Sequence, residues 1–256
     1  MDCKNCQNSL PAEADYCPEC GAKVIRNRLT MRNLWNDVVS KYLDIDNRFL
    51  KTLAHLLSKP EVVIDGYIHG TRKKYVNPIS YFALALTLAG LQVFLTQKFF
   101  PEAYDMSAVT AEGQEELMNT VMGAMQEYSA VLTMIMIPVY ALMARIVFLR
   151  NKKYNYTELL VVFLYYASEV GFLTFIPFLF LHIFGLNYAD ISMYALLFQV
   201  ILGAYYIKRL YDLSTKGIIL KTLLFLLVLV VFYVISVFIT SILLVVTGNM
   251  PVTPPA

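Results

Sequence analysis

The sequence predicts an all-α integral membrane protein with a small cysteine-rich unit at its N-terminus. Three observations support this fold class. Apolar residues make up 58% of the 256 residues and charged residues only 16%, whereas soluble domains are about 45 to 50% apolar. Five apolar segments come close to the length of about 20 residues that a helix needs to cross a bilayer. All four cysteines lie among the first 20 residues.

The cysteines form two CxxC pairs separated by ten residues, and the four ligand candidates are Cys3, Cys6, Cys17 and Cys20. Two such hooks can present four thiolates to a zinc ion in a tetrahedron, with bonds of about 2.3 Å. Gly21 permits the tight turn that points backbone amides at the sulfurs, while Gln7 follows the first hook. We predict a zinc ribbon over residues 1–25. Its four protein ligands close the site, so the zinc is structural and supplies folding free energy.

Two other interpretations of the cysteines are a pair of disulfides and a redox-active CxxC. No apolar run follows Met1 that would read as a secretory signal, so we expect the N-terminus to stay in the cytoplasm. A reducing compartment disfavours disulfides, and the absence of a βαβ pattern disfavours a thioredoxin-like site. The net charge of +2 is too small to indicate nucleic acid binding.

Residues 26–78 are expected to form an amphipathic juxtamembrane block. Thr30 and Asp46 are candidate N-caps of two helices with apolar stripes, and Pro60 ends the second and opens a third, which Gly70 ends. Basic amphipathic helices beside a membrane commonly lie in its interface. The alternative is a small helical bundle packed on the membrane domain, and the sequence leaves both open.

The C-terminal end of this block contains a basic anchor, residues 72–74, followed by the start of a helix. Arg72, Lys73 and Lys74 place three cations where anionic headgroups would meet the chain. Asn77 as N-cap and Pro78 at the first helical position then start the first apolar helix. We therefore expect a lipid bilayer with anionic headgroups as one partner of this protein.

The same block carries a family resemblance, in the stretches Phe49–Leu53, Pro60, Tyr67–Arg72 and Tyr75–Ile79. Residues 46–91 resemble the bacterial family catalogued as domain of unknown function 3667, whose members are similar in pairing an N-terminal zinc ribbon with several membrane spans. Beyond Leu91 the resemblance is one of hydropathy alone. It implies a bacterial inner-membrane location, and it implies no activity and no catalytic residues.

The membrane domain is expected over residues 79–248, followed by a short tail at 249–256. The five expected spans cover residues 79–95, 128–149, 159–184, 191–207 and 218–246. Twelve of the 21 lysines and arginines precede Pro78, and eight more lie near the ends of spans that return to the same side, which leaves Lys98 alone on the other side. The positive-inside rule then predicts a cytoplasmic N-terminus and an external C-terminus.

Three polar side chains inside the expected spans are candidate functional groups: Glu169, Gln199 and Arg145. Glu169 lies about 16 Å along its helix from Glu158, which indicates a position near the midplane. Because a charge there is costly, we expect Glu169 to be neutral and hydrogen-bonded to Gln199 at matching depth on the next span. Arg145 lies close to the end of its span, can reach the interface, and is the weaker partner.

Three classes of function compete. The closed zinc site and the juxtamembrane helices favour a non-enzymatic membrane-anchored interaction or assembly protein with a protein partner at the cytosolic ribbon. Glu169 and two prolines within spans favour a transporter or channel subunit. A membrane enzyme is the least favoured, because the chain carries no HExxH or GxSxG motif. A polar cavity reaching Glu169 would favour transport over assembly.

Overall fold

The computed structural model describes residues 2–11, 13–22, 24, 30–32, 48–104, 121, 123–151 and 153–246, with side chains except at residues 104 and 239–246. The chain divides into two compact units, Met1–Asn47 and Arg48–Ala256. Asp46, the expected second N-cap, lies outside the described residues, as does the tail 249–256. In the first unit Asp2 and Ser9 form an antiparallel bridge that closes the first cysteine hook.

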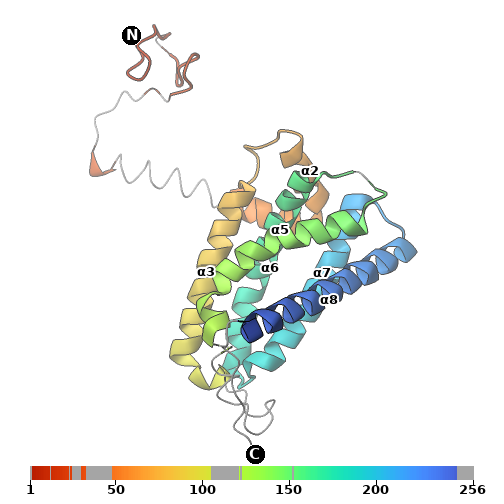
Figure 1. The fold of residues 1–256 in the computed structure, drawn as a ribbon. Coiled ribbons are helices and arrows are strands. Elements are labelled where there is room, and N and C mark those ends of the chain that lie inside the picture. Colours follow the sequence, from red (N-terminus) through yellow and green to blue (C-terminus); the bar gives the residue numbers. More distant parts are fainter. Residues whose placement is uncertain are drawn as a thin grey trace, which may run out of the picture. The chain divides into compact units, whose positions relative to one another are not determined.

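The described part of the second unit is helical (Figure 1). Its helices are a segment at 48–58, α2 (Pro60–Ile68), α3 (Pro78–Phe99), the 3-10 helix η1 (Pro101–Tyr104), α5 (Ser129–Val147), α6 (Tyr156–Ile183), α7 (Tyr188–Tyr211) and α8 (Thr215–Val246). Five of them, α3, α5, α6, α7 and α8, are long and apolar enough to cross a membrane. The protein is thus an all-helical integral membrane protein, as the composition predicts.

Asparagine caps set the starts of three of these helices. The side chain of Asn77 accepts a hydrogen bond from the Ile79 amide at 2.9 Å, which confirms the predicted start of the first span. Asn155 forms a capping box with Glu158, and Asn187 caps α7 through the amide of Asp190. These caps satisfy amides that otherwise lack partners where each helix begins.

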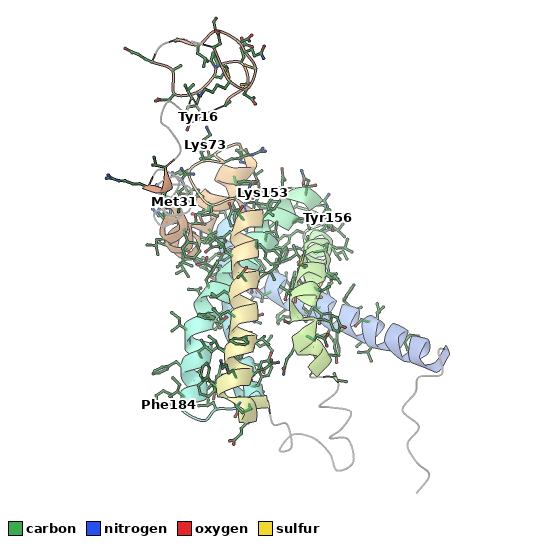
Figure 2. All side chains as sticks on the ribbon, turned by 90° about the vertical axis from the view of Figure 1, so that its left-hand side faces the viewer. Tyr16, Met31, Lys73, Lys153, Tyr156 and Phe184 are labelled. Atoms are coloured by element: carbon green, nitrogen blue, oxygen red, sulfur yellow. The ribbon has the colours of Figure 1, made fainter. Side chains whose placement is uncertain are left out.

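α6 is the central helix of the second unit. It packs against α3, α5 and α7, while α8 packs against α5 and α7. A Cβ added at Gly171 of α6 would lie 3.6 Å from the Cβ of Ala85 of α3, so small side chains allow these two helices to approach closely. Lys73, Lys153 and Tyr156 lie at one end of the helical unit and Phe184 at the opposite end (Figure 2).

The helices at 48–58 and 60–68 are packed on the membrane helices. Leu56, Val63 and Ile64 are fully buried in the main core with Tyr81, Leu159 and Tyr165, among others. The Tyr205 hydroxyl of α7 donates to the Ser58 carbonyl at 2.8 Å. Of the two alternatives for the juxtamembrane block, this part of the chain follows the bundle, because its apolar stripe is buried against protein.

Polar contacts complete the docking of α2. Arg209 of α7 forms a bidentate ion pair with Glu61, a geometry that fixes orientation as well as distance. The hydroxyl of Tyr154 donates to the Asp65 carboxylate at 2.6 Å, and Lys153 lies 3.3 Å from the same carboxylate. Burial of Tyr154 and the adjacent carboxylate raises the pKa of this phenol, so the hydroxyl keeps its proton and remains a donor.

Candidate metal centre and intramembrane polar site

The two cysteine hooks have the same backbone geometry. In the first, the Gln7 amide donates to the Cys3 carbonyl at 2.8 Å; in the second, the Gly21 amide donates to the Cys17 carbonyl at 2.9 Å. Gln7 and Gly21 both adopt left-handed conformations, with φ of 63° and 69°. Glycine adopts this conformation without steric cost, whereas glutamine is strained there. The first hook therefore has the same turn as the second, with glutamine at the position that glycine takes in the second.

The four sulfurs converge on one point. The Sγ atoms of Cys3 and Cys20 are 3.7 Å apart, and those of Cys6 and Cys17 are 3.6 Å apart. All four ligand atoms lie within 4.8 Å of one another. Zinc–sulfur bonds of about 2.3 Å in a tetrahedron require sulfur separations of about 3.8 Å. The quartet therefore fits a metal ion of this kind, and its sulfurs are too far apart to be disulfide-bonded.

The electrostatics of the quartet agree with metal binding. Hydrogen bonds from the Asn5 side chain and the Ala22 amide lower the pKa of Cys20 to about 6. Backbone amides of Cys6 and Asn5 also lower the pKa of Cys3. Cys6 receives a lowering hydrogen bond from the Asn8 amide, yet the neighbouring sulfurs and burial raise its pKa to about 12. Amide groups thus stabilise some of the thiolates, and a bound cation is needed for all four sulfurs to be thiolates at the same time.

In the second unit, Glu169 forms a hydrogen bond between α6 and α3. Its Oε2 accepts from the Tyr81 hydroxyl at 2.8 Å, and both residues are fully buried. Its Oε1 has no hydrogen-bond partner among the described residues. Glu169 is therefore hydrogen-bonded to another membrane helix, and that helix is the first span rather than the next one.

Aromatic side chains surround this pair. The ring of Tyr81 lies 4.8 Å from that of Phe172 and 6.0 Å from that of Tyr165, measured between ring centroids. The Tyr165 hydroxyl donates to the Val76 carbonyl at 2.7 Å, and the Val76 amide donates to Thr52 at 3.0 Å. Val76, just before α3, is thereby hydrogen-bonded through both its carbonyl and its amide. These two bonds fix the position of the start of α3, and with it the position of Tyr81 in the core.

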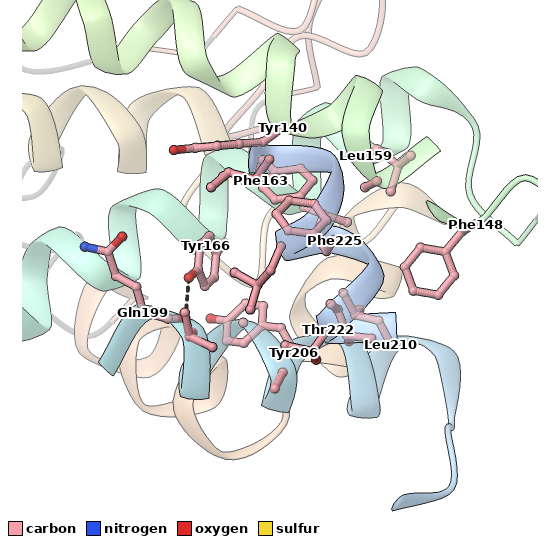
Figure 3. A pocket seen from close by; sticks show the side chains of 18 of the residues that line it. Tyr140, Phe148, Leu159, Phe163, Tyr166, Gln199, Tyr206, Leu210, Thr222 and Phe225 are labelled. Carbon is pink, nitrogen blue, oxygen red and sulfur yellow. Dashed lines mark hydrogen bonds between the residues drawn. The ribbon is translucent and has the colours of Figure 1, made fainter. Parts of the chain in front are cut away.

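The predicted pairing of Glu169 with Gln199 is wrong. The Tyr166 hydroxyl of α6 donates to the backbone carbonyl of Gln199 at 2.7 Å, as Figure 3 shows. Equal depth along two helices does not specify which face each residue occupies. Glu169 lies on the side of α6 that meets α3, whereas Gln199 lines a cavity between α5, α6, α7 and α8.

The count along α6 does not by itself fix the depth of Glu169 in the membrane. Tyr81 is only three residues after Pro78, so the carboxyl group lies near the first turn of α3. α6 has 28 residues and is about 42 Å long, more than the roughly 30 Å of a bilayer core. Leu159, in its first turn, belongs to the same buried core as Val63 and Ile64 of α2, so the start of α6 is covered by protein and is not a marker of the membrane surface.

The other predicted residues lie apart from this site. Arg145 donates to the Tyr154 carbonyl at 3.2 Å, in the connection between α5 and α6, which agrees with its expected position near a span end. Arg72, Lys73 and Lys74 are all exposed, and Arg72 lies over the Tyr67 ring.

Sequence reasoning missed Tyr81 and the tyrosines around it. The chain contains 18 tyrosines, and one near the start of an apolar helix usually marks the membrane interface. The usable signal was the lone acid in a span, because a buried carboxyl group needs a donor and a tyrosine hydroxyl supplies one without adding charge.

Residues 46–90 match the family described as "Protein of unknown function (DUF3667)", which agrees with the resemblance noted from the sequence. Neither the curated proteins nor the solved structures contain a match to the chain. The matched segment comprises helix 48–58, α2 and the first half of α3. It therefore includes Thr52, Val76 and Tyr81, whose hydrogen bonds order the entry into the first span.

Proposed function

We propose that the protein is a non-enzymatic membrane-anchored assembly protein whose zinc ribbon binds a protein partner in the cytoplasm. The observation that supports this most is the geometry of the quartet, in which every cysteine of the chain takes part and all four sulfurs lie within 4.8 Å. A zinc ion held by four thiolates has no open position for substrate, so its use is to order a small recognition unit.

The proposed location is the inner membrane of a bacterium, with the N-terminus in the cytoplasm and the C-terminus outside. Twenty of 21 lysines and arginines support this orientation. Fusion after Ala256 of a reporter that works only in the cytoplasm tests this orientation. Activity of that reporter would place the C-terminus in the cytoplasm and contradict an odd number of spans.

In-cell crosslinking tests the assembly function. A photoreactive residue replaces Tyr16, whose side chain is 61% exposed beside the quartet, in the full-length chain. We expect a discrete adduct to a protein that mass spectrometry identifies, and we expect its loss when Cys17→Ser is added. Gln7→Gly is the matched control, since it changes the first hook and leaves all four ligands. Adducts that are unchanged by Cys17→Ser, or absent from the parent, would contradict the proposal.

A second candidate is a transporter subunit that uses Glu169 as a proton or cation site. It is supported by the buried Oε1 of Glu169, which has no partner among the described residues. Against it, Glu169 does not line the cavity between α5, α6, α7 and α8. Proton flux into vesicles containing the purified protein, and its loss in Glu169→Gln, would establish this candidate in place of the first.

A further inference from the structure

A cavity of about 170 Å³ lies between α5, α6, α7 and α8 (Figure 3). Its walls are mostly aromatic and aliphatic, with Tyr140, Phe163 and Phe225 among the lining residues. An engineered apolar cavity of about 150 Å³ holds one benzene molecule, so this cavity has room for a comparable length of hydrocarbon. Leu196 also lines it and is 58% exposed, so the cavity reaches the outer surface of the bundle.

Two buried hydroxyl groups in the cavity wall have no partner. Tyr206 of α7 and Thr222 of α8 both line the cavity, and among the described residues neither hydroxyl oxygen has a hydrogen-bond partner. The Tyr206 side chain is almost fully buried, with 2% of the residue exposed. Most buried hydroxyls in folded proteins are hydrogen-bonded, so these two are available to donate to an oxygen-bearing occupant.

The two hydroxyls without a described partner lie toward one end of the cavity. Tyr206 is five residues, about 7 Å, from the C-terminal end of α7, and Thr222 is seven residues, about 10 Å, from the start of α8. Leu196 and Leu229 lie about 20 Å from the same helix ends. The hydroxyls thus lie nearer the helix ends, and the deeper wall is hydrocarbon apart from Gln199, an order that matches the ester groups and chains of a lipid.

A cation lies beside the polar end. The ammonium group of Lys221 is 4.9 Å from the centroid of the Phe148 ring, which lines the cavity, and it donates to the Val147 carbonyl at 2.7 Å. No carboxylate of the described residues lies within ion-pair distance of it. A surface with this cation, two free hydroxyls and an apolar interior is complementary to an anionic amphiphile.

We propose that this cavity binds the part of one acyl chain that lies next to the ester group of an anionic phospholipid. This part of the chain lies against Phe163 and Phe225, and the rest of the chain leaves the cavity past Leu196. The ester oxygens of the lipid accept from Tyr206 and Thr222, and its phosphate faces Lys221. This proposal is independent of the assembly function, because it concerns a site on the membrane helices.

Photolabelling of the full-length protein in vesicles tests the proposal. The vesicles contain either phosphatidylglycerol or phosphatidylcholine carrying a diazirine in an otherwise identical acyl chain, and peptide mass spectrometry locates the adducts. We expect phosphatidylglycerol to label the segments around Phe163 and Phe225 at least fivefold more than phosphatidylcholine does. Equal labelling by the two lipids, or labelling confined to other segments, would overturn the proposal.

Variants separate the cavity from the general lipid-facing surface. Ala204→Phe fills the cavity and should reduce its labelling about tenfold, whereas Leu197→Phe, on a 58% exposed position of the same helix, should leave it unchanged. Tyr206→Phe combined with Thr222→Val keeps side-chain size and should reduce phosphatidylglycerol labelling about fivefold, as expected for lost hydrogen bonds. Unchanged labelling in Ala204→Phe, or in the hydroxyl variant, would overturn the assignment, provided thermal unfolding shows that each variant is folded.

Discussion

The hydrogen bond between Tyr81 and Glu169 makes a quantitative prediction about stability. Both side chains are fully buried, the bond is 2.8 Å long, and the second carboxyl oxygen has no partner among the described residues. Tyr81→Phe therefore leaves a buried carboxyl group without its described donor. Leaving a buried polar group unpaired costs about 1–3 kcal/mol, while interhelical hydrogen bonds in membrane proteins average about 0.6 and reach about 1.7 kcal/mol. We expect a loss of about 1.5 kcal/mol.

The reverse change is expected to be milder. Glu169→Leu leaves only a phenol unpaired and removes a polar group whose burial is itself unfavourable, so it should cost about 1 kcal/mol or less. Glu169→Gln retains an acceptor for the Tyr81 hydroxyl and should change stability little. The double variant Tyr81→Phe with Glu169→Leu removes both partners and should recover about 1 kcal/mol relative to the sum of the single changes.

Equilibrium unfolding in mixed detergent micelles measures all of these variants. Tyr194→Phe is the control, because it removes a hydroxyl from an exposed position on α7 and should stay within about 0.5 kcal/mol of the parent. Additivity of the two single changes, with coupling below about 0.3 kcal/mol, would refute the inference that this bond joins α3 to α6.

Three further predictions follow from the other described sites. Protein purified without chelator should contain one zinc ion per chain by elemental analysis, and Cys17→Ser should abolish metal binding without removing the protein from the membrane; retained zinc in Cys17→Ser would count against the quartet. Gly171→Ala should be tolerated, since the new Cβ meets Ala85 at ordinary contact distance, whereas Gly171→Leu should separate α3 from α6 and lower the unfolding temperature by several degrees; equal stability of the two variants would argue against close packing there. Changing the basic anchor, residues 72–74, to glutamine should weaken attraction to anionic vesicles by about 1 kcal/mol per charge while leaving α2 protected from protease, because buried apolar residues dock α2; lost protection would show that the cations hold α2 in place.

The sequence alone predicted the elements whose causes are local. Hydropathy over about 20 residues identifies a span wherever it lies in the fold. Asn77 followed by Pro78 specifies a helix start, and the structure has the cap at that position. The cysteine spacing predicted one cluster, because two CxxC hooks can converge only if both turns form, and Gln7 adopts the left-handed conformation that its turn requires.

Only the tertiary structure decided which polar groups meet. The sequence placed Glu169 and Gln199 at equal depth, but the face of α6 that each neighbour occupies depends on packing, and close approach at Gly171 brings α3 and Tyr81 to Glu169. For the same reason, the sequence did not determine whether the juxtamembrane helices lie on lipid or pack against protein. An apolar stripe that includes Leu56 can be buried in lipid or against protein. Only the assembled bundle provides the protein surface against which it packs.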